Sequence, residues 1–355
     1  MRYPSRNGGI AISGSSETKK DASVREQLRK KHIFCDLING TIFRGWSRLK
    51  PEMLTWLPES GVLKLKGKRG RTIRLEQIRD VAYLAQLPRE HKAIFRVIYG
   101  GEGQSYIDYG MAIRDQGYDA AAYLTQLYAR RQKRREERSL EAGDEFLSGI
   151  KKDDRFVPVV TLCLYYGEKE WDAAVRLFEL LDIPEGEEWI YKYLSDYRLN
   201  LVHAGNVEPK NYRTGLRQVF ELLPFSGDAG KLREYVEKHR AEYENVSEET
   251  CELLLTFMDD KEMKIFEGKN QYYNKEGGYD MCTAFRQMRE EGIQIGEKRG
   301  IQIGEERGIQ IGEKRGEERV NQLIRMLLQE NRGNEIPKSV ADRAYQEKLF
   351  MEYGI

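Results

Sequence analysis

The segment from Ile94 to Tyr99 constrains the fold of this chain more than any other feature. Apart from Arg96 its residues are apolar, β-branched or aromatic, and this composition is typical of a β-strand. The segment leads directly to Glu102 and Gln104, and side chains two positions apart on a strand lie on the same face. We therefore expect an extended strand that presents an acid and an amide side by side.

A second apolar segment begins at Asp80. A hairpin that pairs Tyr83 with Tyr99 would place Asp80 opposite Glu102, and the sequence Pro88-Arg89-Glu90-His91 suits the turn. Carboxylates on adjacent strands can hold a hard cation such as Mg²⁺, which activates water and neutralises charge on a phosphodiester. The pattern predicts Asp80 and Glu102 as metal ligands, with Mn²⁺ able to replace Mg²⁺. In a chain with 33% charged residues, the same pair would also arise by chance.

Further segments follow one another in a distinctive order and spacing. They are Asp36-Leu37-Ile38-Asn39, Arg79-Asp80-Val81, Glu102-Gly103-Gln104, Ile107 to Arg114, Tyr118 to Tyr123, Val159 to Gly167 with Trp171, and Leu194 to Leu201. Together with the glycine-rich repeats near the end of the chain, they resemble the Rpn family of recombination-promoting nucleases, also described as putative transposases of the PD-(D/E)xK superfamily. The resemblance implies a bacterial, Mg²⁺-dependent DNA endonuclease of low sequence specificity, acting in DNA rearrangement or uptake of foreign DNA.

The chain departs from the family pattern at the expected site. Relatives usually have Asn where Gly103 stands, and Gly100 and Gly101 precede it. Glycine in a strand loosens it or marks a close backbone approach. The superfamily usually has Lys at the position of Gln104, and a neutral amide can only orient the attacking water by hydrogen bonds. We expect Asp80, Glu102 and Gln104 to be the catalytic residues. We also expect the metal to contribute more to activating the attacking water than it would beside a lysine.

Other residues near these segments are candidates for secondary roles. Asp36 would add a third acid to the site, or it would cap or solvate its own helix. Arg114 and Tyr118 lie one helical turn apart and would contact the scissile phosphate, or they would form a cation stacked on an aromatic ring.

Binding to nucleic acid has to rest on local charge, because the formal net charge is only +1. The best candidate for contacting phosphates is a cluster of six cations without an intervening acid: Lys64, Lys66, Lys68, Arg69, Arg71 and Arg74. A second basic run, Arg130 to Arg135, is followed at once by Glu136 and Glu137, so a solvated helix end explains it equally well.

The periodicity predicts an α/β protein with a restriction-endonuclease-like αβββαβ core and a C-terminal helical region. We expect a helix over 27–46, strands over 62–65, 73–75, 80–85 and 94–102, a helix over 108–135, a buried strand over 159–165 and a helix from Trp171 to Leu181. The expected domains are a disordered arm over 1–25, a PD-(D/E)xK-like nuclease domain over 26–185, an accessory helical domain over 186–288 and a glycine-repeat helical tail over 289–355.

The tail repeats the sequence Gly-Ile-Gln-Ile-Gly-Glu-Lys-Arg from Gly292, Gly300 and Gly308, with Glu306 in place of Lys in the second copy. Glycine at every fourth position forms a smooth helical stripe that lets another helix approach, although each interior glycine costs up to about 1 kcal/mol of helix stability. We expect a helix that forms on self-association, so that the chain is a homo-oligomer, with a charged linker as the alternative.

Composition limits the remaining choices. The four cysteines are widely spaced and show no zinc-binding spacing, and a reducing cytoplasm is the natural compartment for such a chain. The longest apolar run is too short to span a bilayer. We expect a cytoplasmic protein with DNA as its partner and no membrane association. The rival interpretations are a catalytically weakened DNA-binding or assembly protein, and a nuclease acting on RNA or branched DNA.

Overall fold

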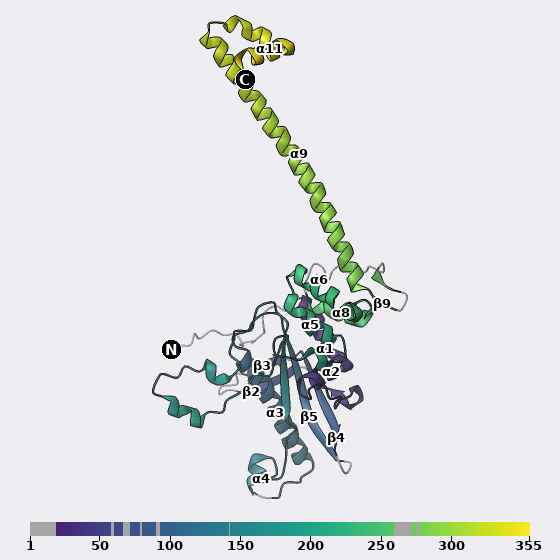
Figure 1. Cartoon of the computed structure of the whole chain (residues 1–355). Helices are drawn as coiled ribbons and strands as arrows, with labels where there is room; N and C mark the ends of the chain where they lie inside the picture. Colours follow the sequence, from purple (N-terminus) through teal and green to yellow (C-terminus); the bar gives the residue numbers. More distant parts are fainter. Residues whose placement is uncertain are drawn as a thin grey trace. The chain divides into compact units, whose positions relative to one another are not determined.

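The computed structural model describes residues 19–57, 60–66, 72–78, 80–89, 93–141, 143–258, 272–274 and 277–355. The chain divides into two compact units, Met1–Ala284 and Phe285–Ile355, and each is considered by itself (Figure 1). Most of the expected arm over 1–25 lies outside the described residues. Residues 19–25, however, belong to the first helix, so the ordered fold begins earlier than expected.

The first unit is built on a five-stranded mixed sheet with the strand order β1-β4-β5-β6-β7. The strands are β1 (Leu54–Trp56), β4 (Val81–Pro88), β5 (Ile94–Gln104), β6 (Val159–Tyr165) and β7 (Leu201–Val202). β1, β4 and β5 are antiparallel, and β5, β6 and β7 run parallel. Tyr83 is paired with Tyr99, which confirms the predicted hairpin register. The protein is therefore an α/β protein, as the sequence predicts.

Helices cover both faces of this sheet (Figure 1). α3 (Met111–Glu136) lies on the face that carries Cys163, where Met111 and Tyr118 pack against that buried thiol. α1 (Lys19–Arg29) and α2 (Lys31–Thr41) lie on the opposite face, and a Cβ added to Gly101 would stand 3.1 Å from the ring of Phe34 in α2. Gly101 thus marks a close approach between strand and helix.

The expected helix over 27–46 is two helices. The chain is extended at Lys30, with φ −69° and ψ 112°, and this residue separates α1 from α2. The expected apolar face of the second helix is buried, with Ile33, Leu37 and Ile38 fully inaccessible. The prediction was right about the packing face and wrong about the continuity of the helix.

The helix predicted from Trp171 to Leu181 was wrong. Only the short 3₁₀ helix η3 (Leu177–Leu180) forms there. The backbone pairs with a distant segment instead: the Leu177 N–H donates to the Tyr197 carbonyl at 2.9 Å, and the Leu199 N–H donates to the Val175 carbonyl at 2.9 Å. This long-range pairing uses backbone groups that a helix would have paired locally.

The strands expected over 62–65 and 73–75 are present, but they form a separate two-stranded sheet of β2 (Ser60–Lys66) and β3 (Thr72–Ile78). Lys64 is paired with Arg74 in this hairpin. Lys68, Arg69 and Arg71 lie outside the described residues. The first strand of the main sheet is therefore β1, which the sequence did not reveal because it is only three residues long.

The remaining elements of the first unit pack onto the same core. α5 (Leu216–Leu222) contacts α2, and α8 (Glu248–Phe257) contacts α1. The other helices are η1 (Pro51–Met53), α4 (Gly143–Ser148), η4 (Glu188–Tyr193), η5 (Pro209–Asn211), η6 (Leu223–Phe225), α6 (Ala229–Lys238) and α7 (Arg240–Tyr243). β8 (Val246–Ser247) pairs with β9 (Gly278–Tyr279). Residues 186–284 thus share a compact unit with the expected nuclease domain.

The glycine repeat lies within one long helix, α9 (Met281–Gln329). In the second unit, η9 (Gly333–Glu335), α10 (Ile336–Ala341) and α11 (Arg343–Tyr353) follow it, and Leu323, Leu327 and Leu349 form a small core. A Cβ added at any glycine from Gly292 to Gly316 would meet nothing within 4 Å. Within the described part of the chain, every helix is too short or too polar to cross a membrane.

Candidate functional site

Asp80, Glu102 and Gln104 are brought together where β5 ends. The Gln104 Nε2 donates to Glu102 Oε1 at 3.4 Å, so the acid and the amide share one face of the strand as predicted. Asp80 directly precedes β4 and accepts the backbone N–H of Gly103 at 2.7 Å through Oδ2. The hairpin register therefore delivers two carboxylates and an amide to one place from two adjacent strands.

Side chains of α3 hold Glu102 from the other side. Arg114 donates to Glu102 Oε1 at 2.8 Å and to the hydroxyl of Tyr118 at 2.9 Å, and it also forms an ion pair with Asp108. Tyr118 donates to the same Glu102 oxygen at 3.2 Å. The Arg114 guanidinium carbon lies 5.9 Å from the Tyr118 ring centroid. This distance agrees with the cation–ring alternative considered for the pair, whereas contact with a scissile phosphate stays a prediction.

Glu102 is an unusual carboxyl, because only 4% of it is exposed. Burial, together with repulsion from Asp80, raises its pKa to about 8, although Arg114 and the hydrogen bond from Tyr118 act in the opposite direction. A buried acid whose charge is disfavoured gains from an additional positive partner. Arg114 is one such partner, since its Nη2 lies 2.8 Å from Glu102 Oε1.

Two buried oxygens at this site have no hydrogen-bond partner: Glu102 Oε2 and Gln104 Oε1. Buried polar atoms are normally paired, so two orphaned oxygens two residues apart on the same strand face require an explanation. A divalent cation bound by carboxylate and amide oxygens would satisfy both, and the donor set is of the hard type that Mg²⁺ prefers. The residues present fit such an ion with Asp80 as the second acid, although the described residues contain no group of three or more His, Cys, Asp or Glu suited to a metal.

α1 also reaches this end of the sheet, which the sequence did not indicate. A Cβ added to Gly103 would lie 3.2 Å from Val24 of α1 and 3.5 Å from Asp80 Oδ2. Tyr166 donates to Asp21 of α1 at 2.6 Å, and burial, Asp21 and Asp80 raise the pKa of that hydroxyl. Because Lys19 to Asp21 looks like a polar arm in the sequence, only the observed helix shows that it adjoins the site.

Asp36, considered either as a third acid or as a residue that caps or solvates its own helix, is hydrogen-bonded to a distant part of the chain. Its carboxylate accepts the backbone N–H groups of Arg213 and Thr214, at 2.8–2.9 Å, and the Thr214 hydroxyl at 2.6 Å. These bonds tie α2 to the segment that precedes α5. Asp36 therefore has a structural role. It resembles the capping alternative, but the backbone groups that Asp36 caps precede α5 and do not belong to its own helix.

A second buried acid lies beneath the site on α3. Asp115 is fully buried and contributes to the raised pKa of Glu102. The Tyr197 hydroxyl bonds both Asp115, at 3.1 Å, and Asp119, at 2.9 Å, and Thr161 donates to Asp119 at 2.7 Å. This network anchors the segment around Tyr197 to α3. In the sequence, it was indicated only by the spacing of the two acids, one helical turn apart.

The two basic runs differ in their environment. Arg130 and Arg134 form ion pairs with Asp154, at 3.2 and 2.6 Å, and these contacts lower the pKa of Asp154 to about 2. The second basic run is therefore partly neutralised within the fold. Lys64 and Lys66 lie in β2 and Arg74 lies in β3, where it is paired with Lys64.

No protein-family model matches the chain, and neither a curated protein nor a solved structure matches it.

Proposed function

We propose that this protein is a metal-dependent DNA endonuclease of low sequence specificity, similar to the recombination-promoting nucleases of the Rpn type. The observation that carries the proposal is the pair of buried, unpartnered oxygens on Glu102 and Gln104 beside the carboxylate of Asp80. Ligands of this kind suit Mg²⁺ or Mn²⁺, and a metal bound there would activate water and neutralise phosphate charge.

The protein's own side chains would have separate tasks. Asp80 and Glu102 would bind the cation, and the amide of Gln104 would orient the attacking water by a hydrogen bond. Arg114 already donates to Glu102 and Asp108, so it would hold Glu102 in position and present a positive charge toward a phosphate. Tyr118 fixes the same Glu102 oxygen.

The arrangement of elements is compatible with a restriction-endonuclease-like core. α2, β1, β4, β5, α3 and β6 follow one another as helix, three strands, helix and strand, if the β2–β3 hairpin is treated as an insertion. In this order of elements, the site residues come from the second and third strands, at the start of β4 and the end of β5, and α3 covers them. This agreement in order supports the proposal but carries less weight than the orphaned oxygens.

The test is cleavage of supercoiled plasmid, linear DNA and RNA by purified protein with Mg²⁺, Mn²⁺ or EDTA. We expect cleavage of DNA with either metal and none with EDTA. Asp80→Asn and Glu102→Gln should fold and lose activity by more than about a hundredfold, because losing even an indirect partner of a metal ligand typically costs 10- to 100-fold. Asp144→Ala, an exposed acid on α4, is the matched control and should cleave at the parental rate.

A second candidate is a DNA-binding or assembly protein with weakened catalysis. The absence of a lysine at Gln104 and the ion pairing of Arg114 to Glu102 favour it. In that case the protein would bind DNA without cleaving it, and Glu102→Gln would leave binding unchanged. A nuclease acting on RNA or branched DNA would instead cleave only those substrates in the same assay.

A further inference from the structure

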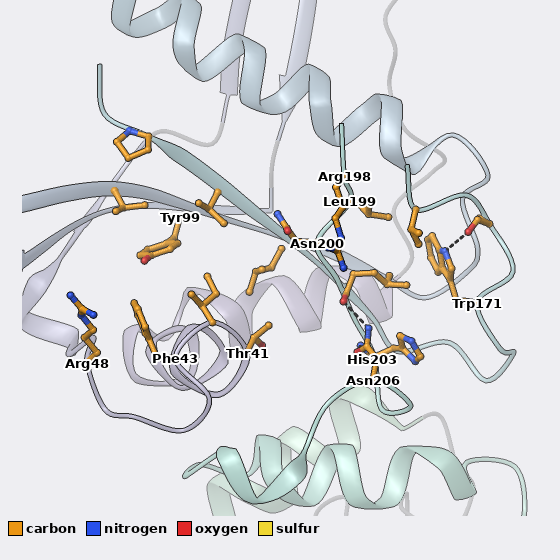
Figure 2. A pocket seen from close by; sticks show the side chains of 18 of the residues that line it. Thr41, Phe43, Arg48, Tyr99, Trp171, Arg198, Leu199, Asn200, His203 and Asn206 are labelled. Carbon is orange, nitrogen blue, oxygen red and sulfur yellow. Dashed lines mark hydrogen bonds between the residues drawn. The ribbon is translucent and has the colours of Figure 1, made fainter. Parts of the chain in front are cut away.

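A cavity of about 1000 Å³ lies beside the end of α2, on the face of β5 that carries Tyr99 (Figure 2). Val97 and Tyr99 line it, whereas Glu102 lies an odd number of positions from both, and alternate residues of a strand face opposite sides. The cavity is therefore a separate place from the acidic pair. Whatever binds there is independent of the proposed nuclease activity.

The wall that the sheet and the end of α2 give to this cavity is largely apolar. It includes Ile42, Leu87, Phe95, Val97, Val160 and Leu162. Ile42 and Phe95 are exposed, so part of this apolar wall faces solvent. Removing apolar surface from water is favourable, and small-molecule sites are mostly apolar with a few placed polar groups. The wall therefore suits a ligand with an apolar body.

One buried polar group faces this cavity without a hydrogen-bond partner. Tyr99 is only 3% exposed, and within the described part of the chain its hydroxyl makes no hydrogen bond. Figure 2 shows its ring pointing from β5 toward Phe43 and Arg48. Burial raises the pKa of this hydroxyl, so it keeps its proton and can donate. Buried hydroxyls are normally paired, so a ligand in the cavity would supply the missing acceptor.

A single cation lies close to this hydroxyl. The charge of Arg48 lowers the pKa of Tyr99 against the effect of burial, which places the two groups within electrostatic reach. The Arg48 guanidinium carbon lies 5.4 Å from the ring centroid of Phe43, and Figure 2 shows all three side chains at one end of the cavity. Arg48 forms no ion pair with any residue that the structure describes. A guanidinium beside a hydroxyl offers donors for a carboxylate, and one positive charge matches one negative charge.

Two polar side chains at the opposite end of the cavity bond within the protein instead. The Nδ1 of His203 accepts the Gly205 N–H at 3.1 Å, and the Asn206 side chain donates to a carbonyl of β7 at 2.9 Å (Figure 2). Arg198, the other arginine of the lining, lies away from Arg48 in this view. We therefore expect the anionic group of a ligand at the first end and its apolar body along the wall.

We propose that this cavity binds a carboxylate with a long apolar chain, of the fatty-acid class, with Arg48 and Tyr99 holding the carboxylate and the apolar wall covering the chain. A short carboxylate would leave the wall uncovered. An uncharged chain would leave the guanidinium and the hydroxyl without an anionic partner. The site thus selects for both parts of the molecule.

Isothermal titration calorimetry of the full chain in EDTA tests the proposal, with every ligand below its micelle-forming concentration. The probes are octanoate, decanoate and dodecanoate as a length series, acetate as the head group alone and 1-decanol as an uncharged chain. We expect saturable binding of decanoate, at least about tenfold tighter than that of 1-decanol or acetate. Each added methylene that the wall covers should tighten binding about fourfold. Absence of saturable binding, or equal affinity for decanoate and 1-decanol, would overturn the proposal.

Variants of the head-group site provide a second test. Arg48→Gln and Tyr99→Phe should each weaken decanoate binding at least about tenfold, as expected for loss of a hydrogen bond to a charged group. Tyr99→Phe keeps the ring and Arg48 is exposed, so both variants should keep the parental melting temperature. Arg96→Gln is the matched control, because Arg96 is exposed on β5 and lies an odd number of positions from Tyr99.

A variant of the wall tests the place of the chain. Val160 lines the cavity from a partly exposed position on β6, so Val160→Phe should fill part of the space and weaken dodecanoate binding at least about tenfold without unfolding the protein. Unchanged affinity in Arg48→Gln, Tyr99→Phe or Val160→Phe, or an equal loss in Arg96→Gln, would contradict the assignment of this site.

Discussion

Asp36 provides the sharpest test of how this fold uses its buried acids. The residue is 5% exposed, and its carboxylate accepts three donors: the N–H groups of Arg213 and Thr214 and the hydroxyl of Thr214. A hydrogen bond to a charged group contributes about 1.5–3 kcal/mol, and donors left buried without a partner add their own desolvation cost. Asp36→Ala should therefore lower the free energy of unfolding by about 3–6 kcal/mol.

Asp36→Asn should have a smaller effect, because the amide oxygen can still accept some of these donors. We expect a loss of about 1–3 kcal/mol. Thr214→Val removes only the hydroxyl and should cost about 1 kcal/mol, which calibrates the series. Urea denaturation followed by circular dichroism measures all three, and metal-dependent cleavage should persist in Asp36→Asn well below its melting temperature. Parental stability together with lost cleavage in Asp36→Asn would refute the structural role and return this acid to the metal site.

Three further predictions concern the site acid, the basic hairpin and the tail. The pKa of Glu102 is raised from an unfolded-state value of about 4.5 to about 8 in the folded protein. The folded state therefore binds this proton more tightly, so the stabilisation from Glu102 in the metal-free protein is present below pH about 4.5 and is lost as the pH rises toward about 8. Urea titrations should show the stability of Glu102→Gln relative to the parent increasing over this range, and a flat difference would contradict the pKa. Replacing Lys64, Lys66 and Arg74 by Gln should weaken binding to all DNA sequences alike, as measured by fluorescence anisotropy. The slope of log affinity against log salt concentration should fall by about 0.9 for each phosphate contact that is lost. A changed sequence preference with an unchanged slope would contradict phosphate binding by these residues. A chain ending before Gly292 should be a monomer that nicks plasmid more than it makes double-strand breaks, whereas the full chain should be a dimer or larger. If light scattering gave the truncated and full-length proteins the same oligomeric mass, the tail would have no part in assembly.

Local pattern was sufficient for the centre of the sheet. The apolar, β-branched and aromatic residues from Ile94 to Tyr99 predict a strand, and the pairing of Tyr83 with Tyr99 is predicted from a hairpin; the structure contains both. The acid and amide of the site share a face for the same reason. These features are local, and local sequence determines them.

Long-range contacts explain what the sequence could not reveal. The segment from Trp171 to Leu181 has a helical composition, but its backbone bonds the chain near Tyr197. Asp36 resembles a site acid until the partners at Arg213 and Thr214, distant in sequence, are seen. Tertiary contacts override propensity in such cases. Two partnerless oxygens at Glu102 and Gln104 likewise emerge only from the packed structure.

The β4–β5 register also limits which insertions and deletions this protein can accept during evolution. Residues 89–93 connect the two strands and lie outside the paired residues of both. One residue added between Tyr99 and Glu102 would move Glu102 to the opposite face of β5, on which α1 and α2 lie, because strand faces alternate with every residue. Length variation among natural variants should therefore accumulate in the connection and be absent from the eleven residues of β5.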